Sequence, residues 1–177
     1  MAEAIYDISN KREGKFLRRK PREFDFAAWK KRDIAELIQR MRKTMREANG
    51  VGLSANQIGV DAKVFVAEVP GANGERKFYA IFNPVIEKMS STKAPLEEGC
   101  LSVPGSFGEV ERADRITIRG FDKNGRPLKI KAWGLLARVF QHETDHLNGA
   151  LFIDKASNVR KDPESERLKR RQLEISH

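Results

Sequence analysis

The sequence has a single cysteine, Cys100, among 177 residues. An internal disulfide is therefore excluded, and the thiol is left as a buried apolar group, a reactive group or a metal ligand. No apolar run approaches the roughly 20 residues that a membrane-spanning helix needs. Residues 1–15 have neither the apolar region of a signal peptide nor the acid-poor character of a transit peptide. We therefore expect a cytoplasmic protein that does not bind membranes.

Internal repeats, long polar tracts and Pro- or Ser-rich linkers are also missing. A chain of 177 residues suits one domain, and 40% hydrophobic residues are enough to form a buried core. We expect residues 1–177 to form a single domain that ends in a basic, less ordered tail over about 157–177.

The net charge of +9 lies mainly at the two ends of the chain, in residues 1–32 and 155–177. Basic surfaces attract polyanions, but a charge run more often only forms a solvated face. Aromatic residues that could stack on bases are sparse in these ends, so we expect no specific DNA binding. Ribosome association through the basic ends, including residues 160–171, is a hypothesis.

The spacing of apolar residues predicts helices in three places. An N-terminal helix over about 25–48 should end at Asn49-Gly50. A second helix should begin at Gly134 and carry one apolar stripe as far as Leu147. A C-terminal helix is predicted after Asp162-Pro163, a pair that is typical of a helix start.

Alternating apolar residues predict two strand pairs between these helices. One hairpin joins residues 62–69 to 76–83, and Asn83-Pro84 should end its second strand or place it at a sheet edge. The other joins residues 115–121 to 126–133. Strand pairs with segregated helices indicate an α+β fold.

The strongest chemical motif is QHETDHL, which contains His142, Glu143 and His146. Residues four apart on a helix share one face, so both imidazoles can meet one metal ion. Glu143 can reach a water beside that metal without binding the metal itself. The motif therefore predicts a metal site, although the same pattern also arises by chance.

A catalytic metal needs a third protein ligand and one open position. After His146 the extended motif of zinc proteases is missing, and only Asp154 lies nearby. Cys100, in EEGCLSVPG, is the better candidate, because one cysteine and two histidines suit zinc or iron.

Two further features concern a substrate. Leu135 and Val139 share a helical face with both histidines, so they are either ordinary core residues or the wall of a pocket, or both. The segment GVGLSANQ lets backbone approach a substrate at its glycines, and Gln57 offers an uncharged donor for an oxyanion. By itself, this segment is more simply a helix end and a turn.

Together, GVGLSANQ, EEGCLSVPG and QHETDHL resemble the three signature segments of peptide deformylases, in the same order and at similar separations. The resemblance covers about residues 33–155 and is weaker at both ends. Ser54 stands where many members have alanine. The implied fold is α+β, with antiparallel β-sheets packed around a central helix that carries the HExxH motif. The helices predicted near the two termini would complete it.

The resemblance also implies a function. The chain would be a metal-dependent hydrolase that removes the N-formyl group from formylmethionine at the start of newly made polypeptides and releases formate. The implied metal is Fe(II) in the cell, with Zn, Ni or Co as possible substitutes. The residue roles that it implies are metal binding by Cys100, His142 and His146, acid–base catalysis by Glu143, and oxyanion binding by Gln57 and the backbone N–H of Leu101.

A substrate pocket and its support follow from helical spacing and the resemblance taken together. Val51, Leu135 and Val139 would hold the methionine side chain, and Gly52 would contact the substrate through its backbone. Glu98 and Arg112 would pair behind the cysteine loop. Arg138 faces elsewhere by periodicity and is interpreted as structural or surface.

Two alternatives remain open from the residues alone. One is an HExxH metallopeptidase that cuts internal peptide bonds, whose metal would not depend on Cys100. The other is a basic nucleic-acid-binding protein with a structural zinc site, although such a site needs four protein ligands and a fourth is hard to find.

Overall fold

The computed structural model of the protein describes residues 3–71 and 73–162. In chain order the elements are α1 (Lys11–Leu17), α2 (Lys31–Glu47), β1 (Gly52–Ser54), the 3₁₀ helix η1 (Ala55–Ile58), β2 (Val64–Pro70), β3 (Arg76–Met89), β4 (Lys93–Cys100), β5 (Val103–Ala113), β6 (Arg115–Phe121), β7 (Pro127–Trp133), α3 (Gly134–His146), the 3₁₀ helix η2 (Phe152–Asp154) and β8 (Ser157–Lys161).

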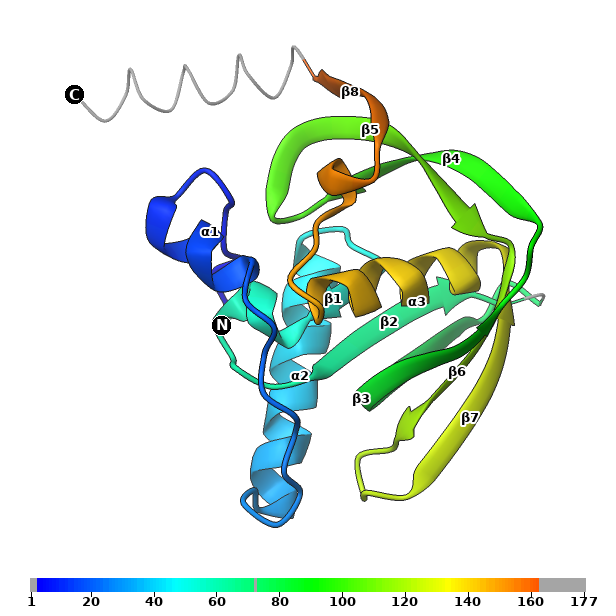
Figure 1. Ribbon diagram of the computed structural model, residues 1–177. Helices are drawn as coiled ribbons and strands as arrows, with labels where there is room; N and C mark the ends of the chain where they lie inside the picture. The colour runs from blue at the N-terminus through cyan, green and yellow to red at the C-terminus, as the bar shows by residue number, and fades with distance from the viewer. Residues whose placement is uncertain (1–2, 72, 163–177) are drawn as a thin grey trace.

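Two antiparallel sheets flank helix α3. The larger sheet has the order β1-β2-β3-β6-β7, and the smaller one has the order β4-β5-β8. Figure 1 shows α3 running between the two sheets, with β2 and β3 on one side and β4 and β5 on the other. The predicted α+β fold, with antiparallel sheets around the HExxH helix, is therefore confirmed.

Apolar residues hold α3 and α2 against the larger sheet. Phe140 of α3 is fully buried, and its ring lies 5.5 Å from that of Phe65 in β2. The apolar face of α2 packs against β1, β2 and β3; its buried members are Ile34, Leu37, Met41 and Met45. Burial of such a side chain stabilises the fold by roughly 1.5–3 kcal/mol. This packing fixes α2, and hence the chain that leaves it toward β1, relative to α3.

The N-terminal helix is shorter than predicted. It begins at Lys31, because Asp25 starts a turn in which its side chain accepts a hydrogen bond from Ala27 N. The preceding aromatic residues pack on the sheet instead, with the ring of Phe24 4.7 Å from that of Phe82. Helix α1 was not predicted from the sequence; Asn10 caps it by accepting from two backbone N–H groups.

The prediction that Asn83-Pro84 ends its strand, or lies at a sheet edge, is wrong. Strand β3 continues to Met89 in the interior of the sheet, between β2 and β6. The register shifts between Phe82 and Val85, and Asn83 adopts a φ of 46°. The Asn83 side chain exchanges two hydrogen bonds with the backbone of Phe24. The irregularity accommodates the proline, which has no N–H to donate to a neighbouring strand.

The two predicted hairpins and the HExxH helix are confirmed, with small changes at their ends. Residues 157–161, the first part of the tail expected to be less ordered, form β8 beside β5. The rest of the predicted tail, with the predicted C-terminal helix, lies outside the described residues. None of the described helices is long and apolar enough to cross a membrane.

Candidate active site and metal centre

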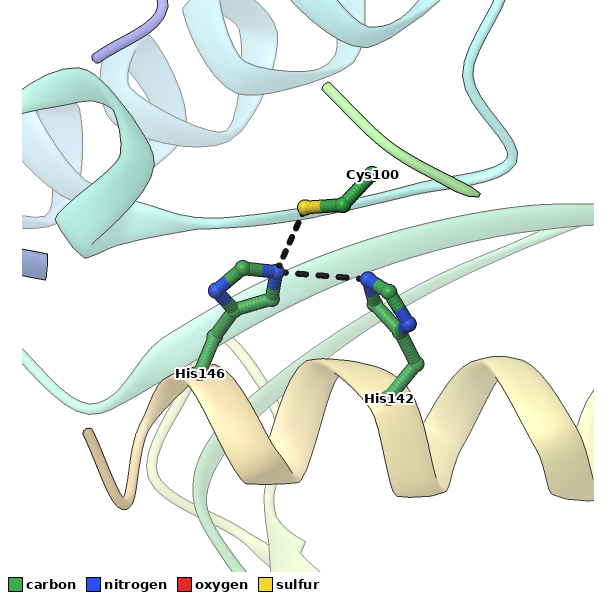
Figure 2. Close-up of side chains that lie close together, drawn as sticks. All are labelled: Cys100, His142 and His146. Carbon is green, nitrogen blue, oxygen red and sulfur yellow. Dashed lines mark hydrogen bonds between the residues drawn. The ribbon is translucent and has the colours of Figure 1, made fainter. Parts of the chain in front are cut away.

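The sulfur of Cys100 and the imidazoles of His142 and His146 converge on one point (Figure 2). The histidines lie one turn apart on α3, and Cys100 ends β4 just before the chain turns into β5. His146 Nε2 lies 3.2 Å from Cys100 Sγ and 3.2 Å from His142 Nε2. All three ligand atoms lie within 4.8 Å of one another. The structure therefore brings together the three residues that the sequence singled out.

The donor set and its surroundings fit a metal cation. One sulfur and two imidazole nitrogens form a three-ligand set that leaves a tetrahedral position open, as catalytic zinc and iron sites require. Burial lowers the pKa of His146 well below its ordinary value, so its imidazole is in the neutral form that binds metals. Burial also opposes charge on His142, but the nearby Cys100 and the contact of Nδ1 with Glu98 raise its pKa to about 10. The centre thus favours a positive charge, which a proton or a metal cation can supply.

Glu98 of β4 supports His142 from behind. Its Oε2 lies 3.0 Å from His142 Nδ1, and Arg112 of β5 donates to both of its oxygens at 2.6 and 2.8 Å. Burial would raise the pKa of Glu98, but the hydrogen bonds from Arg112 and His142 lower it to about 2. An ionised Glu98 fixes Nδ1 of His142 and so turns Nε2 toward His146 Nε2 and the rest of the ligand group. The expected pairing of Glu98 with Arg112 is confirmed.

Arg138 is a structural residue, which was one of its two interpretations, and not a surface residue; the expectation that it faces away from the site is wrong. Its side chain is buried, donates to Glu98 Oε1 at 2.6 Å and donates to the carbonyl oxygens of Val110 and Ala94. Arg138 precedes His142 by four residues, so the helical period itself places both on one face. Glu98 therefore lies between two guanidinium groups and one imidazole.

The side chain of Glu143 is buried beside the segment GVGLSANQ. Only 3% of the residue is exposed, and burial raises the pKa of its carboxyl group. A Cβ atom on Gly52 would lie 2.3 Å from Glu143 Oε1, so only glycine leaves room for the carboxylate there. Ser54 Oγ lies 2.7 Å from the other oxygen, Oε2. The carboxylate is thus held between backbone and a hydroxyl group.

Gln57 approaches the same point from η1. Its Oε1 accepts a hydrogen bond from Ser54 N, while its Nε2 lies 3.1 Å from Ser102 Oγ and 3.7 Å from Cys100 Sγ. The first contact fixes which end of the amide is the acceptor, so the NH₂ group must face Cys100. Ser102 was missed by sequence reasoning, although it lies two residues after Cys100 within the same motif.

Several of these side chains line a cavity of about 490 Å³. The predicted site residues on its wall are Val51, Gly52, Gln57, Cys100, Leu101, Leu135, Val139, His142 and Glu143. His146 is buried behind them and does not line the cavity. Val139 is 5% exposed, whereas Val51 and Leu135 are 37% and 47% exposed. Of the three predicted pocket residues, one therefore lies deep and two lie at the rim.

Comparison with known proteins shows which family this chain resembles in sequence. The family model for polypeptide deformylase matches residues 4–162. A peptide deformylase of Pelotomaculum thermopropionicum is 49% identical over 73% of this chain and 79% of its own length. Another, from Gloeobacter violaceus, is 43% identical over 71% of this chain and 67% of its own length.

Solved structures show the same likeness. A class I type b peptide deformylase from Acinetobacter baumannii is similar with a TM-score of 0.79 at 30% identity, over 88% of this chain and 99% of that one. The peptide deformylase from Thermotoga maritima gives a TM-score of 0.78 at 34% identity, over 89% and 99%. Enzymes of this kind are metal-dependent hydrolases that remove N-formyl groups from newly made polypeptides. The match over residues 4–162, together with these relatives, shows that the chain belongs to the peptide deformylase family.

Proposed function

We propose that the chain hydrolyses N-formylmethionyl peptides in the 490 Å³ cavity, with Cys100, His142 and His146 as ligands of one divalent metal ion. One observation carries this assignment: the three ligand atoms lie within 4.8 Å of one another beside the buried carboxylate of Glu143. Four described protein ligands would indicate a structural site, but the group contains three.

Fe(II) is the proposed metal in the cell, with Zn, Ni or Co as substitutes, because thiolate and imidazole ligands accept each of these ions. When bound, such an ion would lower the pKa of a water to about 7 and so supply a nucleophile at neutral pH. Glu98, held by Arg112 and Arg138, keeps His142 oriented for metal binding.

Glu143 is proposed as the acid–base group. Burial raises the pKa of its carboxyl group, which is the direction that favours proton transfer at neutral pH. Its carboxylate would take a proton from the attacking water and deliver that proton to the departing amine. The water oxygen forms a bond to the formyl carbon, and the C–N bond breaks as the amine takes up the proton, which leaves formate and a free amino terminus.

Gln57 and Leu101 are proposed to stabilise the negative charge that grows on the formyl oxygen. The Gln57 NH₂ group is already turned toward Cys100, because Ser54 N occupies the other end of the amide. Leu101, directly after Cys100, would add its backbone N–H. Loss of one donor of this kind commonly costs about 2.7–4 kcal/mol of transition-state stabilisation.

The methionine side chain is proposed to lie against Val139, with Leu135 and Val51 at the rim and Gly52 in backbone contact. Burial of a methionine side chain stabilises binding by roughly 1.5–3 kcal/mol. Formyl-Met peptides should therefore be preferred over formyl-Asp peptides, whose carboxylate would lose its hydration without a partner. Equal kcat/KM for the two would contradict this pocket.

Cytoplasmic location and association with ribosomes are further proposals. Newly made polypeptides emerge from a polyanionic particle, and the chain has basic ends with a total net charge of +9. Co-sedimentation with ribosomes at low and high salt, with and without the C-terminal residues, tests this association. Identical sedimentation of both forms would exclude a role for the tail.

The decisive experiment measures formate release from formyl-Met-Ala by anaerobically prepared, metal-analysed protein. We expect turnover that requires about one metal ion per chain. Absence of formate release from the metal-loaded protein would contradict the proposal. Cys100→Asp separates it from an HExxH endopeptidase, because only a cysteine-ligated centre should lose metal affinity in this variant.

A further inference from the structure

A second cavity, of about 380 Å³, lies beside the first. Its lining residues are Arg46, Asn49, Gly50, Glu68 and Arg76. Asn49 and Gly50 also line the larger cavity, so this short segment between α2 and β1 forms the border between the two. Neither the metal centre nor the methionine pocket uses the second cavity.

The side chains around this cavity carry more positive than negative charge. Glu68 of β2 is 1% exposed, and both of its oxygens are occupied. Arg46 donates to them at 2.7 and 2.8 Å, and Arg42 donates to Oε1 at 2.5 Å. One carboxylate thus neutralises only one of two guanidinium groups, and Arg46 is still half exposed.

Arg76 adds a third cation to this face. It begins β3 opposite Pro70, and two residues later Phe78 lies opposite Glu68. Because side chains two apart on a strand share a face, Arg76 lies on the same side of the sheet as Glu68 and Arg46. Arg76 has no ion pair in the part of the chain that the structure describes. Lys77, the next residue, belongs to the opposite face, where its Nζ lies over the Tyr79 ring.

The position of the border segment indicates which part of a peptide would reach this cavity. Gly52 marks the reacting end, because a Cβ atom at this position would lie 2.3 Å from Glu143 Oε1. From Gly52 back to Asn49 the chain can span at most about 10 Å, since each residue covers at most about 3.3–3.6 Å. An extended peptide beside this segment therefore needs about three residues to pass from the reacting end to the second cavity. Glu97, which also lines the larger cavity, is paired with Arg160 at 2.6 Å.

We propose that the second cavity is a subsite for a carboxylate side chain at the third or fourth residue of the formylated peptide, bound by Arg46 and Arg76. The inference rests on the proposed function and extends its specificity beyond the methionine pocket. An acidic residue at that position should favour binding, and a basic residue should oppose it. The effect should weaken with added salt, because both arginines are accessible to solvent.

The test compares amidated peptides of the form formyl-Met-Ala-Ser-X, and formyl-Met-Ala-X-Ser, with X as Asp, Asn or Lys. We expect kcat/KM for Asp to exceed that for Asn by about five-fold, the scale of one exposed ion pair. Lys should lie below Asn, and the differences should appear mainly in KM. Calorimetric Kd values of the corresponding unformylated peptides should follow the same order, which provides a measurement that does not depend on turnover.

Matched variants identify the cavity as the cause. Arg76→Gln should abolish most of the preference for Asp over Asn, and Arg76→Glu should favour Lys instead. Lys77→Gln removes the same charge from the neighbouring residue on the other face and should leave the preference and the basal activity unchanged. Equal values for Asp and Asn, or equal losses in Arg76→Gln and Lys77→Gln, would overturn the inference. Hydrolysis of formyl-Met-Ala-Ser-amide tests the proposed function separately, because this peptide lacks the residue X that would reach the second cavity. If it is not hydrolysed, the proposed function fails; if it is hydrolysed without any preference at X, only the subsite fails.

Discussion

The hydroxyl group of Ser54 lies 2.7 Å from Oε2 of Glu143, and both residues are buried. Ser54 ends β1 at the edge of the larger sheet, whereas Glu143 belongs to the central helix, so the contact joins two of the three signature segments. A hydroxyl donor therefore faces the proposed acid–base carboxylate, and the ionised form of Glu143 is the form that accepts its hydrogen bond.

We predict that Ser54→Ala lowers kcat by about two- to ten-fold, because a hydrogen bond of this kind contributes roughly 0.5–1.5 kcal/mol. KM should change little, since the hydroxyl group faces the catalytic carboxylate and not the methionine pocket. Kinetics should be measured at equal metal content. Ser90→Ala, in the turn between β3 and β4, provides the control. Unchanged kcat in Ser54→Ala would show that the contact is only structural.

Glu143→Ala should keep its metal and lose nearly all turnover. The carboxylate is not among the three converging ligand atoms, so its removal leaves the donor set intact. General acid–base catalysis commonly contributes 10²–10⁴-fold, and kcat should fall by about that factor. Formate release and metal content should be measured on the same preparation. A metal-replete variant with wild-type turnover would refute the assignment.

Glu98→Gln should weaken metal binding by about 10–100-fold, the usual effect of losing a partner that orients a ligand histidine. An amide at this position no longer offers His142 and the two arginines a shared negative charge. Competition with a chelator measures the affinity, and circular dichroism confirms that the variant folds. Glu97→Gln changes the neighbouring, exposed carboxylate and serves as the control. Equal metal affinity in Glu98→Gln and Glu97→Gln would contradict a role for Glu98.

The local sequence predicted much of the metal centre, because two of its three ligands lie close together in the sequence. The two histidines are one helical turn apart, and the helix that carries them ends within one residue of the predicted position. The third ligand followed from the shortage of other candidates and from the family resemblance. By contrast, the partners of Arg138 lie on β4 and β5, and only the packing of the smaller sheet on α3 shows that this arginine is buried.

The errors have similar physical causes. Asn83-Pro84 carries a strong local signal for a strand end, yet the Asn83 side chain bonds the Phe24 backbone and lets the strand continue. Residues 157–161 (SNVRK) contain one apolar residue and so carry no apolar alternation, and all five are exposed. Their strand depends on pairing with β5, which no pattern within those five residues indicates.

Glu68 should make the stability of the protein depend on pH in the acid range. Hydrogen bonds from Arg46 and Arg42 lower the pKa of this carboxyl group from 4.5 to about 2, although burial opposes the shift. Because the folded-state pKa lies below the unfolded one, the stabilising contribution is fully present above about pH 4.5. It should be lost as the pH falls from about 4.5 towards 2.

The test compares urea unfolding of the wild type and Glu68→Gln between pH 7 and pH 3. At pH 7 the variant should be less stable by about 1–3 kcal/mol, because two guanidinium groups lose a charged acceptor. The difference should shrink as the pH falls below about 4.5, since the wild-type carboxylate is then progressively protonated on unfolding. Glu75→Gln, an exposed carboxylate before β3, should differ little from the wild type at every pH. A Glu68→Gln difference that stays constant across this range would show that charge on Glu68 does not stabilise the fold.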